Sequence, residues 1–226
     1  THQDKDGAWR SNLSVFATNK IESYTYNTRT AWALIYFFDV AKELKYKEGA
    51  IKNIEYALTQ QLPNGWFKNN CLSDPDAPLL HTIAYSLRGI LEVGDFLKNE
   101  KYIAIVKKAA DVLIERQNKD GSLQGRFNSK WEPTVPWICL TGVAQMGTIW
   151  GRLFQITGEL KYADSLKKAN RFLKSVQILD PNNKNIHGGI AGSYPLHGRY
   201  GKFEILNWAV KFFVDSLMLE IKSKIA

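Results

Sequence analysis

Residues 3–9 read QDKDGAW, and versions of this stretch return along the chain, as QLPNGWF at residues 61–67 and QNKDGSL at residues 117–123. The glycines of these three stretches are 58 and 56 residues apart. Each glycine follows Asp or Asn, which is typical of a turn, because glycine takes a positive φ at no steric cost. A looser fourth version begins at Gln177 and ends in the HGG of residues 187–189. The sequence therefore indicates a repeat of about 56 to 60 residues.

A second marker keeps the same period. Tyrosine follows lysine at Tyr46, Tyr102 and Tyr162, which are 56 and 60 residues apart. We expect each of these tyrosines to lie at the start of a helix. Because two independent markers share one period, they predict a repeated structural unit.

The segments between the markers predict paired helices, because their apolar residues recur at spacings of three and four. The expected helices cover residues 30–44 and 48–61, 81–97 and 100–117, 141–157 and 160–177, and a last one from Asn207 to about Ser223. The first helix of each pair is apolar almost all round and the second carries a lysine-rich side. A helix that is apolar all round is buried and one with a charged stripe is peripheral. Repeating such pairs in two layers predicts an all-α fold, an α/α toroid.

The number of hairpins is about three and a half, whereas closed toroids usually have five to seven. Residues 3–9 also read as the end of a repeat whose helices are absent. We therefore expect residues 1–226 to form a single toroid domain that is an incomplete ring and the C-terminal part of a longer chain. The alternative, that the domain is an open arc, stays open.

Composition sets outer limits on function. The chain is 45% hydrophobic and carries a net charge of +8, and it has no run of 18 apolar residues, so no membrane span is expected. Two cysteines, Cys71 and Cys139, give no disulfide framework and fit a reducing, cytoplasmic location, although a single bridge stays open. The lysines form a solvated face or attract an acidic polysaccharide or a membrane surface, and both interpretations stay open. No zinc-finger spacing or RNA-binding motif favours nucleic acid. We expect no metal or other cofactor, and the sequence leaves the oligomeric state undecided.

Several stretches resemble known families. The QDKDGAW form resembles the repeat of terpenoid cyclase and prenyltransferase toroids, and residues 137–173 resemble sugar-acting toroids such as glucuronyl C5-epimerases and six-hairpin glycosidases. The whole looks most like a bacterial family found beside polysaccharide genes, through HGGIAGSYP at residues 187–195 and NWAVKFFVDSLM at residues 207–218. The resemblance implies the α/α toroid fold and a glycan as the ligand, and it marks fold more than chemistry.

The sequence lacks the catalytic motifs of several of these families, which excludes some activities. The Asp-x-Asp-Asp motif of squalene cyclases is absent, and neither cysteine supplies the Asp-x-Cys pair of the prenyltransferase zinc site. Lanthionine cyclases use Cys-His-Gly, where this chain has Ile186-His187-Gly188.

A site is expected where the inner helices of a toroid begin, beside three long loops at residues 65–80, 121–140 and 179–206. These loops and their N-terminal counterpart carry aromatic residues that suit the apolar face of a sugar ring. The candidates are Trp9, Trp66, Trp131, Trp137, Tyr194 and Tyr200. The alternative, that these rings fill the top of the toroid as core, stays open.

Three residues are candidates for catalysis. His81 lies at a helix start, where a neutral imidazole is favoured and can act as a base. Glu132 follows a tryptophan and is a candidate general acid, and Tyr194 is a second acid–base group. The alternatives are a structural histidine and an exposed loop glutamate.

The remaining binding candidates are arginines that could clamp a carboxylate or sulfate, and polar groups at a helix start or in the Gly-rich loop. They are Arg29, Arg126, Arg199, Gln145, His187 and His197.

These residues predict a toroid that binds or modifies an acidic polysaccharide, as a lyase or an epimerase. Such enzymes need a base and a cation beside a uronate carboxylate, whereas a hydrolase needs two carboxyl groups. Glu132 has no obvious loop partner except Asp180 or Glu204, so hydrolysis ranks lower. A non-catalytic glycan-binding scaffold and an isoprenoid-binding toroid remain as alternatives, so whether the chain is an enzyme is left open.

Overall fold

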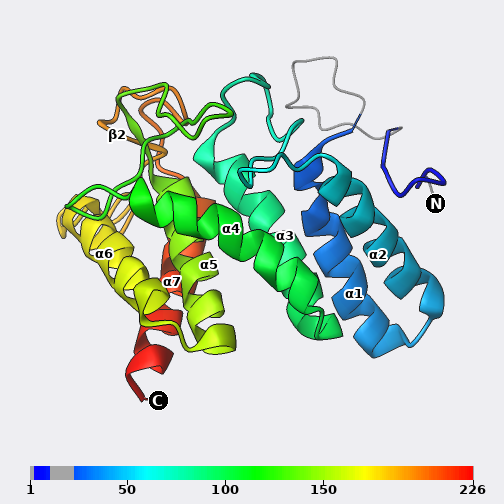
Figure 1. Ribbon diagram of the computed structural model, residues 1–226. Coiled ribbons are helices and arrows are strands. Elements are labelled where there is room, and N and C mark those ends of the chain that lie inside the picture. Colours follow the sequence, from blue (N-terminus) through cyan, green and yellow to red (C-terminus); the bar gives the residue numbers. More distant parts are fainter. Residues whose placement is uncertain (1–2, 11–22, 226) are drawn as a thin grey trace. The chain divides into compact units, whose positions relative to one another are not determined.

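The structure is a computed structural model that describes residues 3–10 and 23–225 (Figure 1). The described residues contain three helical hairpins followed by one further helix. The elements are η1 (Thr25–Asn27), α1 (Thr28–Ala41), α2 (Leu44–Thr59), α3 (Leu80–Leu97), α4 (Glu100–Glu115), β1 (Ile138–Cys139), α5 (Leu140–Thr157), α6 (Leu160–Val176), β2 (Ser193–Tyr194) and α7 (Asn207–Ile225). The last five helices begin within one residue of the predicted starts.

The first hairpin differs from the prediction at its turn. Lys42 takes a left-handed conformation with φ 57° and ends α1, so the helix predicted to run to Leu44 stops at Ala41. Leu44 then opens α2, four residues before the predicted start. A left-handed residue after the last helical residue is a common way to end a helix, but it is usually glycine, so lysine gave no signal.

The described chain divides into two compact units. The first unit consists of Thr1–Pro78, Thr82–Ala109 and Asn128–Glu132, and the second of Leu79–His81, Ala110–Phe127 and Pro133–Ala226. Helices α1 and α2 belong to the first unit, and α5, α6, α7 and both strands belong to the second. That the chain is one domain stays a prediction.

In the first unit, α3 contacts α1 and α4 contacts α2. Gly89 of α3 lies against Thr28 of α1, where an added Cβ would come within 2.4 Å of the Thr28 carbonyl oxygen. The Tyr102 hydroxyl of α4 donates to the Glu55 carboxylate of α2. Since α1 also packs along α2, the hairpins form an inner and an outer layer, as the apolar and lysine-rich patterns predict.

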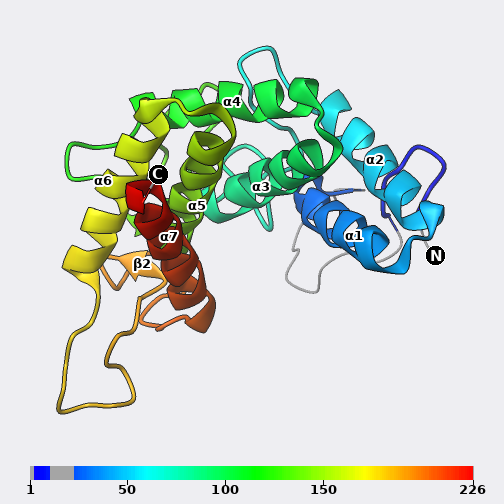
Figure 2. The ribbon, with the colours of Figure 1, turned by 90° about the horizontal axis from the view of Figure 1, so that it is seen from below.

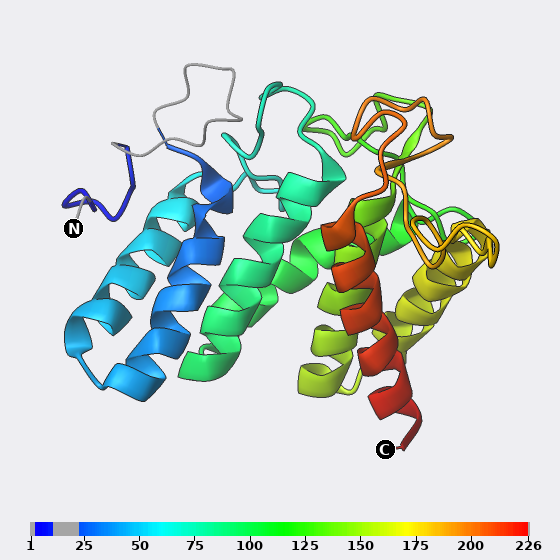
Figure 3. The same cartoon turned by 180° about the vertical axis from the view of Figure 1, so that it is seen from behind.

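In the second unit, α5 is packed against both α6 and α7 (Figure 2). Of its 18 residues, 13 are buried. Two glycines bring α7 close: a Cβ on Gly147 would lie 2.3 Å from Ser216 Oγ, and one on Gly151 would lie 2.9 Å from Leu219 Cβ. The antiparallel pair β1–β2 precedes α5, and the loops gather at the N-terminal ends of α5 and α7 (Figure 3).

The repeated glutamine–glycine stretch is a turn closed by the glutamine side chain. In all four copies the glutamine Nε2 donates to the glycine carbonyl oxygen, at 2.9 to 3.3 Å, and the glycine has φ between 80° and 97°. The pairs are Gln3 with Gly7, Gln61 with Gly65, Gln117 with Gly121, and Gln177 with Gly188. The loosest copy in sequence therefore makes the same bond across a longer loop.

Two of these turns lie directly against an outer helix. A Cβ on Gly121 would lie 2.1 Å from the carbonyl oxygen of Lys168 in α6, and Gln117 Nε2 also donates to Ser165 O at 3.1 Å. In the first unit Gly7 stands equally close to Lys52 O of α2. Glycine is therefore required at these turns by both its φ and the lack of space for a side chain.

The repeated tyrosine joins consecutive outer helices. Besides the Tyr102–Glu55 bond, the Tyr162 hydroxyl donates to Asp111 of α4 at 2.7 Å, within the second unit. Burial first, and the carboxylate partner second, raise the pKa of both tyrosines well above the usual value. Tyr46 of α2 packs edge-on against Phe37 of α1, with ring centroids 4.7 Å apart.

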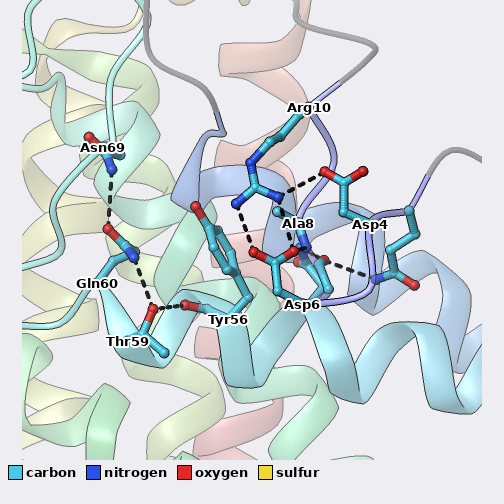
Figure 4. A network of polar contacts seen from close by, with 11 residues as sticks. Asp4, Asp6, Ala8, Arg10, Tyr56, Thr59, Gln60 and Asn69 are labelled. Atoms are coloured by element: carbon cyan, nitrogen blue, oxygen red, sulfur yellow. Dashed lines mark hydrogen bonds and ion pairs between the residues drawn. The ribbon is translucent and has the colours of Figure 1, made fainter.

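The first turn carries a further ion-pair network (Figure 4). The Arg10 guanidinium donates to Asp6 through both terminal nitrogens, at 3.0 and 2.7 Å, and to Asp4 at 2.8 Å. The same guanidinium lies 5.5 Å from the ring centroid of Tyr56 in α2. Arg10 therefore links the turn to the helix that the turn packs on.

This network gives a testable titration. The hydrogen bond from Arg10, followed by the Ala8 backbone amide, lowers the pKa of Asp6 from 3.8 to about 2. Since the pKa is lowered in the folded state, the stabilisation is complete above the unfolded value and is lost as pH falls from about 4 through about 2. We expect Arg10→Met to move the midpoint of the Asp6 carboxyl signal toward 3.8 in a carbon-13 NMR titration. An Asp6 midpoint that is unchanged in this variant would contradict the network.

The turn glycines give a stability prediction with a matched control. Gly158, at the end of α5, also has positive φ (72°), but an added Cβ there meets nothing within 4 Å. We expect Gly158→Ala to cost about 1 kcal/mol from backbone strain alone. Gly121→Ala should cost about 3 kcal/mol or more, because strain and overpacking add. Urea unfolding of both variants measures the difference, and equal losses would show that the turn does not need the contact with Lys168.

Candidate functional site

The site is built around His81, the second residue of α3. Its side chain is nearly buried, at 7% exposed, and its Nδ1 lies 2.8 Å from Oε1 of Gln145 in α5. Gln145 is itself 3% exposed. The two residues are 64 positions apart in sequence, so the fold alone brings them together.

Two aromatic side chains extend this pair toward solvent. The Tyr200 ring lies beside the imidazole of His81, with centroids 5.4 Å apart and planes inclined by 40°. Trp208, the second residue of α7, donates from Nε1 to the Tyr200 hydroxyl at 3.0 Å and is 45% exposed. We call Gln145, His81, Tyr200 and Trp208 the His81 cluster. It runs from the core to the surface of the second unit, at the starts of α3, α5 and α7.

The approach of α5 to the start of α3 depends on Gly142. A Cβ on Gly142 would lie 2.8 Å from Leu80 Cβ and 3.0 Å from His81 N. Gly142 is three residues before Gln145, so both lie on one face of α5. The start of α3 is held from another side, because Leu80 N donates to Gly125 O at 2.9 Å.

Tyr200 is positioned by the loop between α6 and α7. Ser193 Oγ donates to Tyr200 O at 2.7 Å and accepts from Tyr200 N at 3.1 Å. A Cβ on Gly192 would lie 2.3 Å from Tyr200 O. The glycines of the HGGIAGSYP segment therefore let this loop fold tightly on itself.

Cys139 lies directly before α5 and is fully buried. Burial raises the pKa of the Cys139 thiol to about 12, while the backbone amides of Gly142 and His81 and the charge of Arg126 act in the opposite direction. The thiol is therefore neutral near pH 7. The backbone of Arg126 forms an isolated antiparallel bridge with Leu79, the residue directly before α3. Cys71 and Cys139 are both free and buried, so they do not form the bridge that the sequence left open.

Other candidates in the second unit lie apart from this cluster or are covered. Trp137 is buried over Gly125, where a Cβ would come within 2.1 Å of the ring. Tyr194 is 49% exposed and packs edge-on against Phe172 of α6, whereas its neighbour Ser193 is buried against Tyr200. Since successive strand residues face opposite sides, Tyr194 lies on the face of β2 away from Tyr200. The side chains of His187, His197 and Arg199 are exposed in the loop.

The first unit contains the remaining tryptophans and Glu132. Trp66 and Trp131 pack edge-to-face with centroids 5.0 Å apart, each 3% exposed, and Trp131 Nε1 donates to Asn64 O at 3.1 Å. These two rings are thus core, the alternative that the sequence had left open. Glu132 is exposed and accepts from Asn128 Nδ2 at 2.8 Å.

Arg29 is the second residue of α1 and belongs to an aromatic group in the first unit. Its guanidinium carbon lies 4.3 Å from the ring centroid of Tyr85 and 5.2 Å from that of Trp32. Trp9 is partly buried in the first turn. That these residues bind a ligand stays a prediction.

His81, Gln145, Arg126 and Tyr200 are residues that the sequence pointed to, whereas Trp208 was missed. A signal for Trp208 was present in the repeat. Arg29, His81, Thr141 and Trp208 are the second residues of α1, α3, α5 and α7. Aligning the inner helices by their starts would have put Trp208 in the same register as His81.

Among residues 3–10 and 23–225, no group of three His, Cys, Asp or Glu side chains could hold a metal ion. In the same described part of the chain, no helix is long and apolar enough to cross a membrane.

Comparison with known proteins shows similarity in structure alone. No protein-family model and no curated protein sequence matches the chain. Among solved structures, it is similar to an unsaturated glucuronyl hydrolase specific for heparin, with a TM-score of 0.74 at 13% identity over 100% of this chain and 66% of that one. The chain has the α/α toroid fold. The predicted fold class and the resemblance to six-hairpin glycosidase-like toroids are thereby confirmed.

Two further structures show the same likeness. One is an α-1,6-mannanase of a Salegentibacter species, with a TM-score of 0.72, 11% identity, and 100% of this chain and 61% of that chain covered. The other is an unsaturated glucuronyl hydrolase from a Bacillus species that degrades glycosaminoglycan, with a TM-score of 0.72, 11% identity, and coverage of 96% and 63%. The chain therefore spans less than two thirds of the length of each of these proteins. At such low identity the likeness establishes the fold and leaves the chemistry to the residues.

Proposed function

We propose that the chain is part of a carbohydrate-modifying toroid, and that the His81 cluster binds an acidic saccharide. Tyr200 and Trp208 would stack against a sugar ring, His81 would exchange a proton, and Arg126 would attract the carboxylate. The observation that carries this proposal is the contact between a nearly buried histidine and an aromatic pair that reaches the surface.

The composition of the cluster supports this ligand class. Sugars present an apolar ring face and a rim of hydroxyl groups, which suits the faces of Tyr200 and Trp208 and the polar atoms beside them. The net charge of +8 favours approach of a polyanion. Several proteins of similar structure act on uronate-containing or other saccharides according to their descriptions, and this points the same way.

The side chains favour proton abstraction over hydrolysis. A glycosidase of the usual type needs two carboxyl groups on either side of the bond. The His81 cluster offers an imidazole, an amide, a phenol and an indole instead. An imidazole beside a uronate can remove the proton next to the carboxylate, which is the step shared by lyases and epimerases.

A non-catalytic glycan-binding module is the second candidate. It is favoured by the burial of His81, which is only 7% exposed and so resembles a structural histidine. In that case Tyr200 and Trp208 would bind the sugar and His81 would serve only to support them.

The test is binding and turnover of acidic oligosaccharides by the longest available chain, starting from a glycan array. We expect Arg126→Ala to weaken binding about tenfold to a hundredfold, because a charged hydrogen bond to the carboxylate is lost. His81→Ala should lower turnover about a hundredfold or more with binding largely kept. Arg171→Ala, which removes an exposed arginine from α6, is the control for charge alone.

The outcomes separate the candidates. Binding that survives with no turnover in any assay would favour the binding module. No binding of any glycan, or equal losses in Arg126→Ala and Arg171→Ala, would overturn the proposed site.

A further inference from the structure

We infer that Gln145 is a positioning residue that keeps His81 neutral, with its proton on Nδ1 and its lone pair on Nε2. This inference rests on the proposed function for its catalytic meaning, but the tautomer itself can be measured without any substrate.

The geometry determines the position of the proton. An amide oxygen only accepts hydrogen bonds, so the 2.8 Å contact between His81 Nδ1 and Gln145 Oε1 requires Nδ1 to donate. A neutral imidazole carries one proton, and the hydrogen bond made by one nitrogen decides the state of the other. Nε2 is therefore the nitrogen that can accept a proton.

The Gln145 side chain is itself held in place. It projects from α5, in a stretch where every residue from Leu140 to Gly151 is buried. Gly142, on the same face, lets this part of α5 approach the backbone of His81. The amide therefore has little freedom to leave the imidazole.

The charges around His81 favour the neutral ring. Gln145 gives an uncharged acceptor, whereas a carboxylate at the same place would favour the imidazolium. The first turn of α3 carries the partial positive charge of a helix N-terminus, which also disfavours imidazolium. The His81 backbone amide lies beside the neutral thiol of Cys139, and the ring of Tyr200 lies 5.4 Å from the imidazole between centroids. Arg126 is bridged to Leu79, two residues before His81, and adds a positive charge that also disfavours imidazolium. The surroundings thus suit a base that is uncharged before it reacts.

The test uses long-range proton–nitrogen NMR spectra of the imidazole near neutral pH, which report the protonation of each ring nitrogen. The chain has four histidines, so the spectrum of His81→Asn assigns the His81 signals. We expect the wild-type ring to be neutral with the proton on Nδ1. Gln145→Met keeps the length of the side chain but removes the acceptor, and should move the proton largely to Nε2. Gln145→Glu should give a ring protonated on both nitrogens.

Turnover gives a second readout. We expect Gln145→Met to lower kcat about tenfold or more with a smaller change in KM, since a histidine in the wrong tautomer cannot act as the base. A wild-type spectrum with the proton on Nε2, or a Gln145→Met spectrum that still shows Nδ1–H, would overturn the inference. If Gln145→Met does not fold, as judged by circular dichroism, the wild-type and Gln145→Glu spectra still decide.

Failure of the proposed function gives a different pattern. In that case the three spectra would be as expected, while His81→Ala would bind and turn over saccharides as the wild type does.

Discussion

The contact between a glutamine–glycine turn and an outer helix organises the rest of this structure. In the second unit the turn at Gly121 is closed by Gln117 and lies against the backbone of Lys168 in α6. Since the turn has no room for a side chain, its position on α6 is fixed. Four residues later Gly125 O accepts from Leu80 N, which is the first residue of α3. A backbone contact on an outer helix therefore fixes the start of an inner helix.

The His81 cluster also depends on close backbone packing at small residues. Gly142 allows α5 to touch Leu80, and that approach places Gln145 under His81. Gly192 and Ser193 fold the following loop so that Tyr200 covers the imidazole. Chemical groups from the starts of three inner helices and one loop meet because small residues permit close backbone contacts. The turns thus contribute to the site without supplying any side chain to it.

The helical repeat could be predicted because its signals are local. Apolar spacing, the Asp-Gly and Asn-Gly turns and the Lys-Tyr helix starts each concern residues near one another in sequence. The end of α1 could not be predicted, since Lys42 adopts a conformation usually taken by glycine. The sequence also could not show whether Trp66 and Trp131 lie in the site or in the core, because a loop tryptophan can face a ligand or another ring. Their edge-to-face contact in the core follows from tertiary packing alone.

The site, too, has residues that the sequence could predict and contacts that it could not. His81 could be chosen because a helix start has a known electrostatic effect on an imidazole. Its pairing with Gln145 could not, since it joins positions 64 residues apart. Tyr194 was a candidate because of its residue type, and the register of β1 with β2 places it opposite Ile138, with its ring edge-on to Phe172 of α6. Where a side chain faces in a two-residue strand is decided by pairing and has no signal in the strand itself.

The most direct measurement of the central claim is a crystal structure of the protein soaked with a saturated uronate-containing disaccharide, which still carries the proton next to its carboxylate. The account predicts density for the sugar ring against Tyr200 and Trp208, with its carboxylate near Arg126 and its reacting carbon beside Nε2 of His81. Density bound elsewhere on the second unit, with the His81 cluster vacant at saturating ligand, would contradict it.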